Sequence, residues 1–304
     1  MKFNVFSEEW WLDAVSINGE WGREDIFENG KLVASFPWYL KKKIGFKYLC
    51  MPPMTQSLGP YIDHPNNVKY AQKLSREKYL VNELIDKLPY FDHFEQAFSV
   101  ELTNWLPFYW RGFSQTTLYT YRLSNIRNQE NLWKGLQTKI RTDIRKAKKI
   151  GVNIEISDDI ENFIELNSKT FLNKGLKNPY SNELIKRIYY ASIKNNSGAL
   201  FLAKGLDGET HAGIFLIWNK YCSYYLLGAG DQNLRNSGAT SLTIWEGIKY
   251  VSQFTDIFDF EGSMNPSIES FFRGFGAYQV PYHFVKRTNS KILSLFKSTK
   301  SIFK

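Results

Sequence analysis

The chain has 304 residues, of which 43% are hydrophobic and 23% charged, enough to bury the core of one large or two medium domains. This composition excludes a disordered, collagen-like or coiled-coil protein, and no apolar run approaches the roughly 20 residues of a membrane-spanning helix. Two cysteines, Cys50 and Cys222, are too few for a disulfide framework, and the four histidines lack metal-ligand spacing. Acidic residues stand where a signal peptide would be apolar. We therefore expect a cytoplasmic protein without a metal site.

The net charge of +9 is concentrated in two segments. Residues 139–149 hold six basic side chains and one acid, and residues 286–304 hold six basic side chains and no acid. The rest of the chain is nearly neutral, so the charge does not indicate a protein that coats itself uniformly on nucleic acid.

The first half of the chain predicts two helices and four strands. Ser7 can cap a short helix over 7–18, and Asn29-Gly30 is a hairpin turn between strand-like runs. In chain order, the expected elements are helix 7–18, strands 22–28 and 31–40, a loop over 50–62, helix 66–88, and strands 93–104 and 112–124.

The pattern changes near residue 125, where we expect a domain boundary. The second half is expected to contain helices 125–137 and 138–150, strand 152–157, helices 158–173 and 181–195, strands 199–205, 211–219 and 221–228, helix 239–253, strand 256–260, helix 266–274 and strand 278–286. The order of elements predicts an α+β (α/β) fold with two domains, 1–125 and 126–287, each a mixed, mostly antiparallel sheet flanked by helices. A basic tail, 288–304, follows.

Residues 229–240 leave a strand and enter a helix, a junction that favours anion binding. Unbonded N–H groups and the helix dipole both point at such a site. Gly238 would let the backbone approach a phosphate closely, and Arg235 could add a charged contact. The alternative is an ordinary helix N-terminus with a glycine turn.

The basic helix 138–150 is a second candidate for anion binding. Arg141, Arg145 and Lys149 are spaced at i, i+4 and i+8, so they share one face and repel one another unless an anion lies between them. Arginine suits bidentate phosphate contact. The alternative is a solvated basic face.

Three ordered motifs resemble the FemAB-like branch of the GNAT superfamily of acyltransferases, over roughly 20–287. They are the helix pattern Arg141, Arg145, Lys146, Ala147, Gly151, Val152, the strand end Asp259-Phe260-Glu261-Gly262, and Phe272-Arg273-Gly274-Phe275-Gly276. GNAT members also place the pyrophosphate of acyl-coenzyme A on an Arg/Gln-x-x-Gly-x-Gly/Ala motif, matched by Arg235 and Gly238, with Thr240 in the last position. The resemblance implies two tandem GNAT-like domains, the first of them degenerate.

The resemblance also implies the members of a site. Acyl-CoA would be a co-substrate rather than a permanently bound cofactor, held by Arg235, Ser237, Gly238, Ala239 and Thr240. The acceptor would be bound by Arg141, Arg145, Phe272, Gln56 and Tyr61. The catalytic candidates are Glu261 as a base, with Asp259 as the alternate, Arg273 as a positive charge, and Tyr225 as the acid for the leaving thiolate. Tyr224 is the alternative acid, because alternation along a strand allows only one of the two. The alternative structural roles are a turn cap for Glu261 and core packing for the tyrosine.

The function we expect is transfer of an acyl group from acyl-CoA to an amine of an amino sugar or of a cell-envelope or polysaccharide precursor. One alternative is an aminoacyl-tRNA-dependent Fem-type peptidyltransferase acting on a peptidoglycan precursor. Arg273, where Fem members carry Lys, and the lack of a long helical arm weigh against it. A second alternative is a non-catalytic GNAT-like binding protein.

The tail 288–304 can form an amphipathic helix with lysines opposite Ile292, Leu295, Phe296, Ile302 and Phe303. Such a helix would contact an anionic membrane at its inner face, where a lipid-linked sugar or peptide acceptor would reside. The alternative is a basic, partly disordered end.

Overall fold

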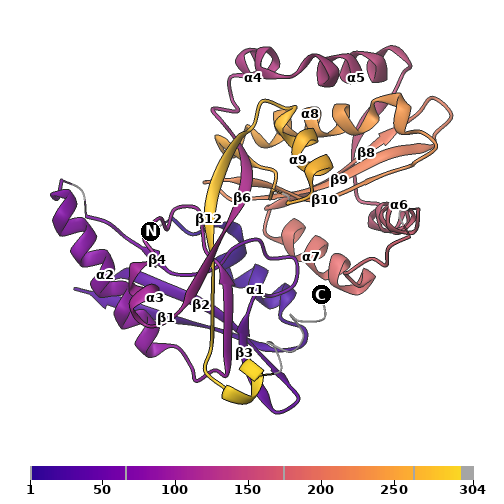
Figure 1. Cartoon of the computed structure of the whole chain (residues 1–304). Coiled ribbons are helices and arrows are strands. Elements are labelled where there is room, and N and C mark those ends of the chain that lie inside the picture. The colour runs from indigo at the N-terminus through magenta and orange to yellow at the C-terminus, as the bar shows by residue number, and fades with distance from the viewer. Residues whose placement is uncertain (1, 66, 174, 263, 296–304) are drawn as a thin grey trace. The chain divides into compact units, whose positions relative to one another are not determined.

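The computed structural model describes residues 2–65, 67–173, 175–262 and 264–295 as two compact units, each with helices packed on strands (Figure 1). Unit 1 takes its described residues from Met1–Leu118 and Pro281–Lys304, and unit 2 is Tyr119–Val280. Among the residues described, none of the helices combines the length and the apolar character that crossing a bilayer requires.

Unit 1 is a mixed sheet covered by helices. Its elements are η1 (Val5–Ser7), α1 (Glu9–Val15), β1 (Glu20–Glu28), β2 (Lys31–Lys43), β3 (Phe46–Cys50), β4 (Tyr61–Ile62), α2 (Tyr70–Lys87), β5 (His93–Ala97), α3 (Leu106–Trp110), and the parts of β6 (Ser114–Ser124) and β12 (Tyr278–Thr288) that fall within it. The strand order is β1-β2-β3-β5-β12, with β4 on β2. Only β3 and β5 are parallel among the neighbours paired in this order.

Local sequence explains the first hairpin and the core of unit 1. Asn29 and Gly30 have φ of 50° and 75°, as a two-residue turn between antiparallel strands requires, so the predicted hairpin is correct. The core is an aromatic cluster joined by the apolar face of α2. Its rings are Phe36, Phe94, Phe98, Phe108 and Phe113, and α2 adds Leu80, Val81 and Leu84.

Four expectations for unit 1 need correction. The strand predicted over 93–104 ends at Ala97, and α3 follows where no helix was expected. The strand β3 was not predicted, and β4 lies within the expected loop 50–62. The turn that produces β3 is Ile44-Gly45, with φ of 51° and 77°. An isoleucine rarely adopts a positive φ, so the sequence gives no usual turn signal there.

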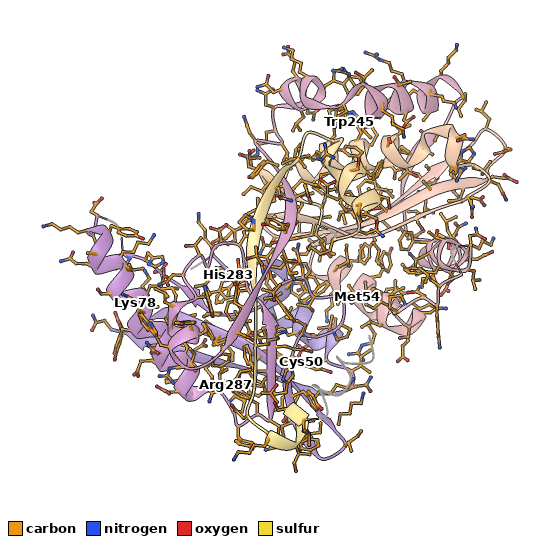
Figure 2. All side chains as sticks on the ribbon, viewed as in Figure 1. Cys50, Met54, Lys78, Trp245, His283 and Arg287 are labelled. Atoms are coloured by element: carbon orange, nitrogen blue, oxygen red, sulfur yellow. The ribbon has the colours of Figure 1, made fainter. Side chains whose placement is uncertain are left out.

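Strand β12 explains why the observed units differ from the predicted division at 125/126 and 287/288. Its second half pairs with β5, from Phe284 opposite Ala97 to Thr288 opposite His93. The guanidinium of Arg287, labelled in Figure 2, lies over the ring of Phe113, a member of the aromatic core, at 5.3 Å from the ring centre. Because these contacts belong to unit 1, residues 281–288 group with the first half of the chain.

The described part of the tail begins in unit 1. Asn289 donates hydrogen bonds from N to Asp92 O (2.8 Å) and from Nδ2 to Phe91 O (3.0 Å). Residues 291–295 are helical, with Ile292 60% exposed and Leu295 69% exposed. The remainder of the predicted amphipathic helix, 296–304, lies outside the described residues.

Unit 2 is a six-stranded sheet with helices on both faces. Its elements are the rest of β6, α4 (Gln129–Gly135), α5 (Thr138–Lys149), β7 (Asn153–Ser157), α6 (Ile160–Leu172), α7 (Asn182–Lys194), β8 (Gly198–Lys204), β9 (Thr210–Trp218), β10 (Ser223–Gly230), η2 (Arg235–Ser237), α8 (Ala239–Val251), β11 (Ile257–Asp259), α9 (Pro266–Arg273) and the start of β12. The strand order is β6-β11-β10-β9-β8-β7, and only β10 and β11 are parallel neighbours.

Alternation along β9 divides unit 2 into two packed faces. Ile214 and Leu216 meet α8 in one core, which α4, α5 and α9 complete. Phe215 packs on Tyr189 of α7, and α6 lies on the same face through Phe163. Side-chain caps at Asn128, Asp159 and Ser181 begin α4, α6 and α7. The predicted order of elements in unit 2 is therefore correct.

Candidate functional site

The start of α8 is the predicted anion site. Gly238 has φ of 80° and caps the helix, and the Ala239 N–H donates to Ser237 Oγ (3.2 Å). Among the described residues, the N–H groups of Gly238, Thr240 and Ser241 meet no acceptor. Arg235 is exposed, directly before this turn. The predicted donor-binding residues therefore share one helix N-terminus, where Ser237, Gly238 and Ala239 are buried and Arg235 is exposed.

Gly238 has a structural role that the sequence did not predict. A Cβ built on Gly238 would lie 2.2 Å from the carbonyl oxygen of Asp143, in the backbone of α5. The glycine therefore permits contact between two helices, whether or not a phosphate is bound. The same contact joins two stretches that the sequence treated separately, because it sets the basic helix α5 against the start of α8.

Two arginines of α5, predicted to bind the acceptor, have intramolecular contacts. Arg141 donates from Nη2 to Thr138 Oγ1 (3.3 Å) and from Nη1 to Lys134 O (3.5 Å). The Arg145 guanidinium lies 5.6 Å from the centre of the Trp133 ring. Both contacts are weak enough for an anion to compete with them. The role of these arginines stays a prediction.

Strands β10 and β11 share only a short parallel pairing. They pair only at Ser223–Phe258 and Tyr224–Asp259, and the register of β10 on β9 shifts between Tyr225 and Leu227. A β-bulge of this kind bends a strand locally, and β10 stays paired with β9 beyond it, as far as Gly230 opposite Ala212. The bend lies where the resemblance implies that β10 flanks an acyl chain.

The two tyrosines at the bend point to opposite faces. Tyr225 packs on Phe272, with ring centres 5.5 Å apart, and its hydroxyl occupies the space where Gly228 would carry a Cβ. Burial raises the pKa of Tyr225. Tyr224 is buried on the other face, and burial, followed by Cys222, raises its pKa. Both phenols therefore stay protonated at neutral pH, and only Tyr225 lies on the Phe272 side.

Side chains of α6 cover the backbone edge that the bend exposes. Asn167, 1% exposed, donates from Nδ2 to Gly228 O (3.2 Å), and Thr170 Oγ1 bonds both Gly230 O (3.1 Å) and Gly230 N (3.2 Å). Asn178, between α6 and α7, donates to Asn167 Oδ1 (2.8 Å). Sequence reasoning missed these residues because a polar side chain inside a helix is normally read as solvent-facing.

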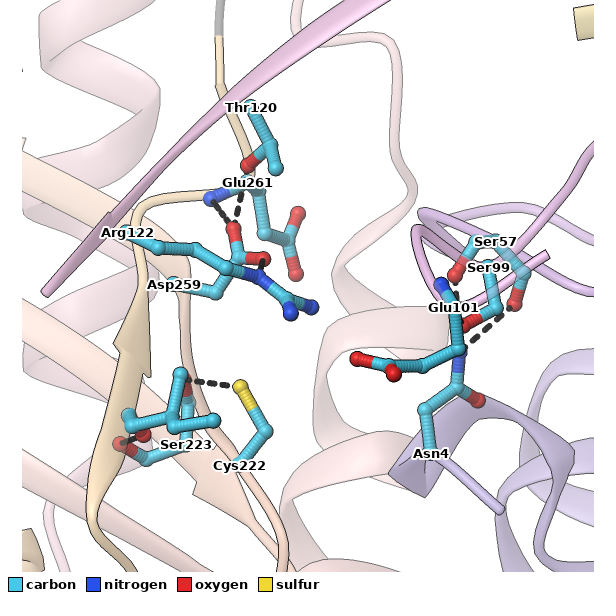
Figure 3. Close-up of polar contacts among 11 residues, drawn as sticks. Asn4, Ser57, Ser99, Glu101, Thr120, Arg122, Cys222, Ser223, Asp259 and Glu261 are labelled. Carbon is cyan, nitrogen blue, oxygen red and sulfur yellow. Dashed lines mark hydrogen bonds and ion pairs between the residues drawn. The ribbon is translucent and has the colours of Figure 1, made fainter. Parts of the chain in front are cut away.

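Asp259 is the centre of a buried polar cluster (Figure 3). Its Oδ2 accepts from Arg122 Nε (2.6 Å), and its Oδ1 accepts from Thr120 Oγ1 and from Glu261 N (2.7 Å). Burial alone would lower the pKa of Arg122, but the charge of Asp259 outweighs it and holds that pKa above its usual value. Because Asp259 is bound on both oxygens, it stabilises the structure and is a poor candidate for the alternate base.

Glu261 directly follows this cluster. Its backbone has φ of 60°, and its Oε1 is buried with no hydrogen-bond partner among the described residues. Burial, followed by the charge of Asp259, raises the pKa of Glu261 well above its usual value. Strain and a shifted pKa together are typical of functional positions.

Arg273 and Glu261 are not brought into contact. Arg273 Nε pairs with Glu269 Oε1 (2.8 Å) on α9, and Glu269 interacts with Tyr121. Tyr121 belongs to the core under α8, whereas Thr120 and Arg122, its neighbours on β6, point to Asp259. The two catalytic candidates Arg273 and Glu261 therefore have separate contacts.

The predicted residues in unit 1 have mainly structural contacts. The Tyr61 hydroxyl accepts from Ser7 Oγ (2.8 Å), and burial is the main cause that raises its pKa. Tyr61 also lines a polar pocket of about 390 Å³ with His64 and Glu77. Gln56 is half-buried in the loop before β4.

A pocket in unit 2, of about 650 Å³, lies along α8 and β7 and holds none of the predicted residues. Its lining includes Lys148, Glu246, Lys249 and Tyr250. Within the described part of the chain, no three His, Cys, Asp or Glu side chains gather as a metal-ion site would require.

The raised pKa of Glu261 predicts a pH-dependent stability. The folded state holds this proton to higher pH than the unfolded state, so stability falls as pH rises from the ordinary glutamate value through the folded value. We expect Glu261→Gln, relative to the natural chain, to be more stabilising at pH 8 than at pH 4. Urea unfolding at both pH values measures this, and an equal difference at the two would contradict it.

Comparisons with known proteins identify the fold and the domain. Residues 134–262 match the family model described as acetyltransferase (GNAT) domain. FemX superimposes with a TM-score of 0.72 at 15% identity, over 92% of this chain and 91% of that chain. A search of the curated proteins gives no match.

Two further solved structures share the fold. The C-terminal domain (DUF2156) named for a lysylphosphatidylglycerol synthetase of Agrobacterium fabrum has a TM-score of 0.55 at 13% identity, over 96% of this chain and 95% of that chain. A tandem GNAT protein from the clavulanic acid biosynthesis pathway has a TM-score of 0.51 at 9% identity, over 91% and 93%.

The chain thus carries a GNAT acetyltransferase domain in unit 2, and the predicted α+β fold with tandem GNAT-like domains is confirmed. The likeness to FemX, at 15% identity, shows a shared fold, and the match of residues 134–262 to a GNAT domain is the finding that indicates an acyltransferase.

Proposed function

We propose that this chain transfers an acyl group from acyl-CoA to an amine of an amino sugar or of another cell-envelope or polysaccharide precursor. The observation that carries the proposal is the start of α8, where the N–H groups of Gly238, Thr240 and Ser241 meet no acceptor among the described residues. Backbone amides at a helix N-terminus bind phosphates, and Arg235 adds a positive charge. The bulged part of β10, beyond its short pairing with β11, would receive the acyl end of the donor.

The chemistry requires alignment and protonation rather than a bound cofactor. An amine attacks the thioester carbonyl, a C–N bond forms, and the C–S bond breaks. The acceptor can be a small molecule or a lipid-linked sugar or peptide. The exposed Ile292 and Leu295, among the lysines of the tail, support a peripheral contact with an anionic membrane.

Thr240→Asp tests donor binding without damaging the helix. A carboxylate in the first turn of α8 stabilises the helix by about 0.3–1 kcal/mol but repels a diphosphate at the same amides. We expect the stability of the variant to be unchanged or higher and its affinity for acetyl-CoA to fall about tenfold or more, that is, by about 1.4 kcal/mol. Calorimetric titration with acetyl-CoA measures the affinity.

Asn182→Asp is the matched control, because it adds the same charge to the first turn of α7. It should leave acetyl-CoA affinity as in the natural chain. Equal affinity of Thr240→Asp and the natural chain, or no acetyl-CoA binding by either, would count against the proposal.

A second candidate is transfer from aminoacyl-tRNA. The observation that favours it is that the basic helix α5 adjoins the start of α8, where a polyanionic donor could contact both. This function predicts that log affinity for charged tRNA falls steeply with log salt concentration and that Arg145→Ala lowers the slope by about 1. Binding that ignores salt would exclude it, and lack of turnover with either donor would favour a non-catalytic GNAT-like binding protein.

A further inference from the structure

The pocket of about 650 Å³ in unit 2 is an elongated trough at the edge of the sheet. Helix α8 forms one wall from Leu242 to Gln253, which lie roughly 16 Å apart along the helix axis. The other wall is β7, the last strand in the described order of the sheet, through Ile154 and Ile156. The volume lies in the range of small-molecule sites, and the elongated shape suits an extended ligand better than a compact one.

One end of the trough is apolar and aromatic. Ile156 lies opposite Phe201 in the pairing of β7 with β8, and the Phe201 ring packs on Tyr250 of α8, with ring centres 5.4 Å apart. Ile156 faces the same side of the sheet as Ile154, which packs against the core under α8, yet Ile156 is 57% exposed. An apolar ligand over Ile156 would remove this surface from water.

Beside the aromatic end, the trough carries a net positive charge. The charged side chains among the described lining residues are Lys148, Glu246 and Lys249, which sum to +1. Lys148, in the last turn of α5, and Lys249 both pair with Glu246, at 3.1 Å and 2.6 Å. An ammonium group has three donors, so each lysine keeps donors for a further anion after its contact with Glu246. Glu246 is one turn of α8 from Tyr250, so the charged and the apolar ends adjoin.

We propose that this trough binds an amphipathic anion, a ligand with an apolar chain and one anionic headgroup. The chain lies over Ile156, Phe201 and Tyr250, and the headgroup accepts hydrogen bonds from Lys148 and Lys249. A free fatty acid and an anionic lipid share this chemistry. The site is independent of the proposed function, because none of the residues predicted to bind the acyl donor or the acceptor lines it.

Decanoate is the probe for this site, and decanol is its neutral counterpart. In the full chain, labelled with ¹³C at the isoleucine methyl groups, decanoate below its micelle concentration should shift the signals of Ile154 and Ile156. It should leave the signal of Ile185, which is buried on α7, unchanged. Calorimetric titration measures both affinities, and decanol should bind about tenfold more weakly, because its hydroxyl carries no charge for the lysines.

Two variants test the two ends of the trough separately. Lys148→Gln removes the net charge and should weaken decanoate binding about fivefold without changing the affinity for decanol. Lys194→Gln is its matched control, because Lys194 is an exposed lysine in the last turn of α7, and it should change neither affinity. Ile156→Asp should abolish the binding of both ligands. Since Ile156 is already 57% exposed, the fold should be kept, and chemical denaturation checks this.

Vesicles of phosphatidylcholine and phosphatidylglycerol distinguish the two sources of the ligand. If Ile156→Asp cosediments with them less than the natural chain does, the ligand is a membrane lipid, and if the two cosediment equally, it is a soluble acid. Three results would each overturn the proposal: no shift of the Ile154 and Ile156 signals, equal affinities for decanoate and decanol, or unchanged decanoate binding by Lys148→Gln. Failure of acetyl-CoA binding would instead bear only on the proposed function.

Discussion

Arg122→Met is expected to destabilise the protein by about 3–5 kcal/mol, because it leaves the carboxylate of Asp259 buried without a counter-charge. Asp259 is fully buried, and Arg122 Nε lies 2.6 Å from its Oδ2. Urea unfolding at pH 7 measures the loss.

The double variant Arg122→Met with Asp259→Asn is the matched control. It removes both charges and keeps an acceptor oxygen for Thr120 and for the Glu261 N–H, so we expect it to be more stable than Arg122→Met alone. Equal stability of the single and double variants would show that packing by the arginine, rather than its charge, is what matters at this position.

Gly238→Ala is the second variant with a large expected effect, about 2–4 kcal/mol of lost stability. A left-handed backbone costs an L-residue about 1–2 kcal/mol, and overpacking a close contact commonly costs about 1–3 kcal/mol. The new Cβ would lie 2.2 Å from Asp143 O, a backbone atom that cannot move without shifting α5. Chemical denaturation measures the loss.

Gly230→Ala is a control in the same strand–loop–helix segment, because its Cβ would have Thr240 Oγ1 as nearest neighbour at 3.5 Å. It should cost much less than Gly238→Ala. If the two glycine variants are equally stable, the contact between α5 and α8 is not rigid.

Because Gly238 packs against α5, loss of donor binding in a Gly238 variant would not by itself demonstrate a phosphate site. Thr240→Asp is the sharper test of donor binding.

The sequence predicted most helices and strands because their signals are local. Asn29-Gly30 specifies a hairpin, and Ser181 and Asp159 specify helix starts, without reference to the rest of the chain. The Ile44-Gly45 turn was not predicted, because the pairing of β2 and β3, rather than the residue types, imposes its geometry. The pairing of residues 284–288 with β5, nearly 200 positions earlier, has no local signal either.

The candidate site was predicted in its motifs but not in its contacts. The candidate anion site at the start of α8 was inferred from Arg235 and Gly238, and Glu261 was singled out from its place after a buried strand. That Arg273 pairs with Glu269 could have been inferred from their i, i+4 spacing. Two further bonds could not be inferred from any periodic pattern in the sequence. Asn167 bonds Gly228 across 61 positions, and Arg122 bonds Asp259 across 137 positions.

The path of the chain through unit 1 has a consequence for biosynthesis. The strand that pairs with β5 is supplied by residues 284–288, so this pairing in the first unit cannot form until those residues have been translated. Unit 2 is one continuous stretch and can fold earlier on the ribosome, although it is encoded later than most of unit 1. During that interval β5 is an unpaired edge open to wrong partners. A single cut within the chain also cannot separate the two units. A circular permutation that opens the chain between residues 280 and 281 would instead make each unit one continuous stretch of sequence.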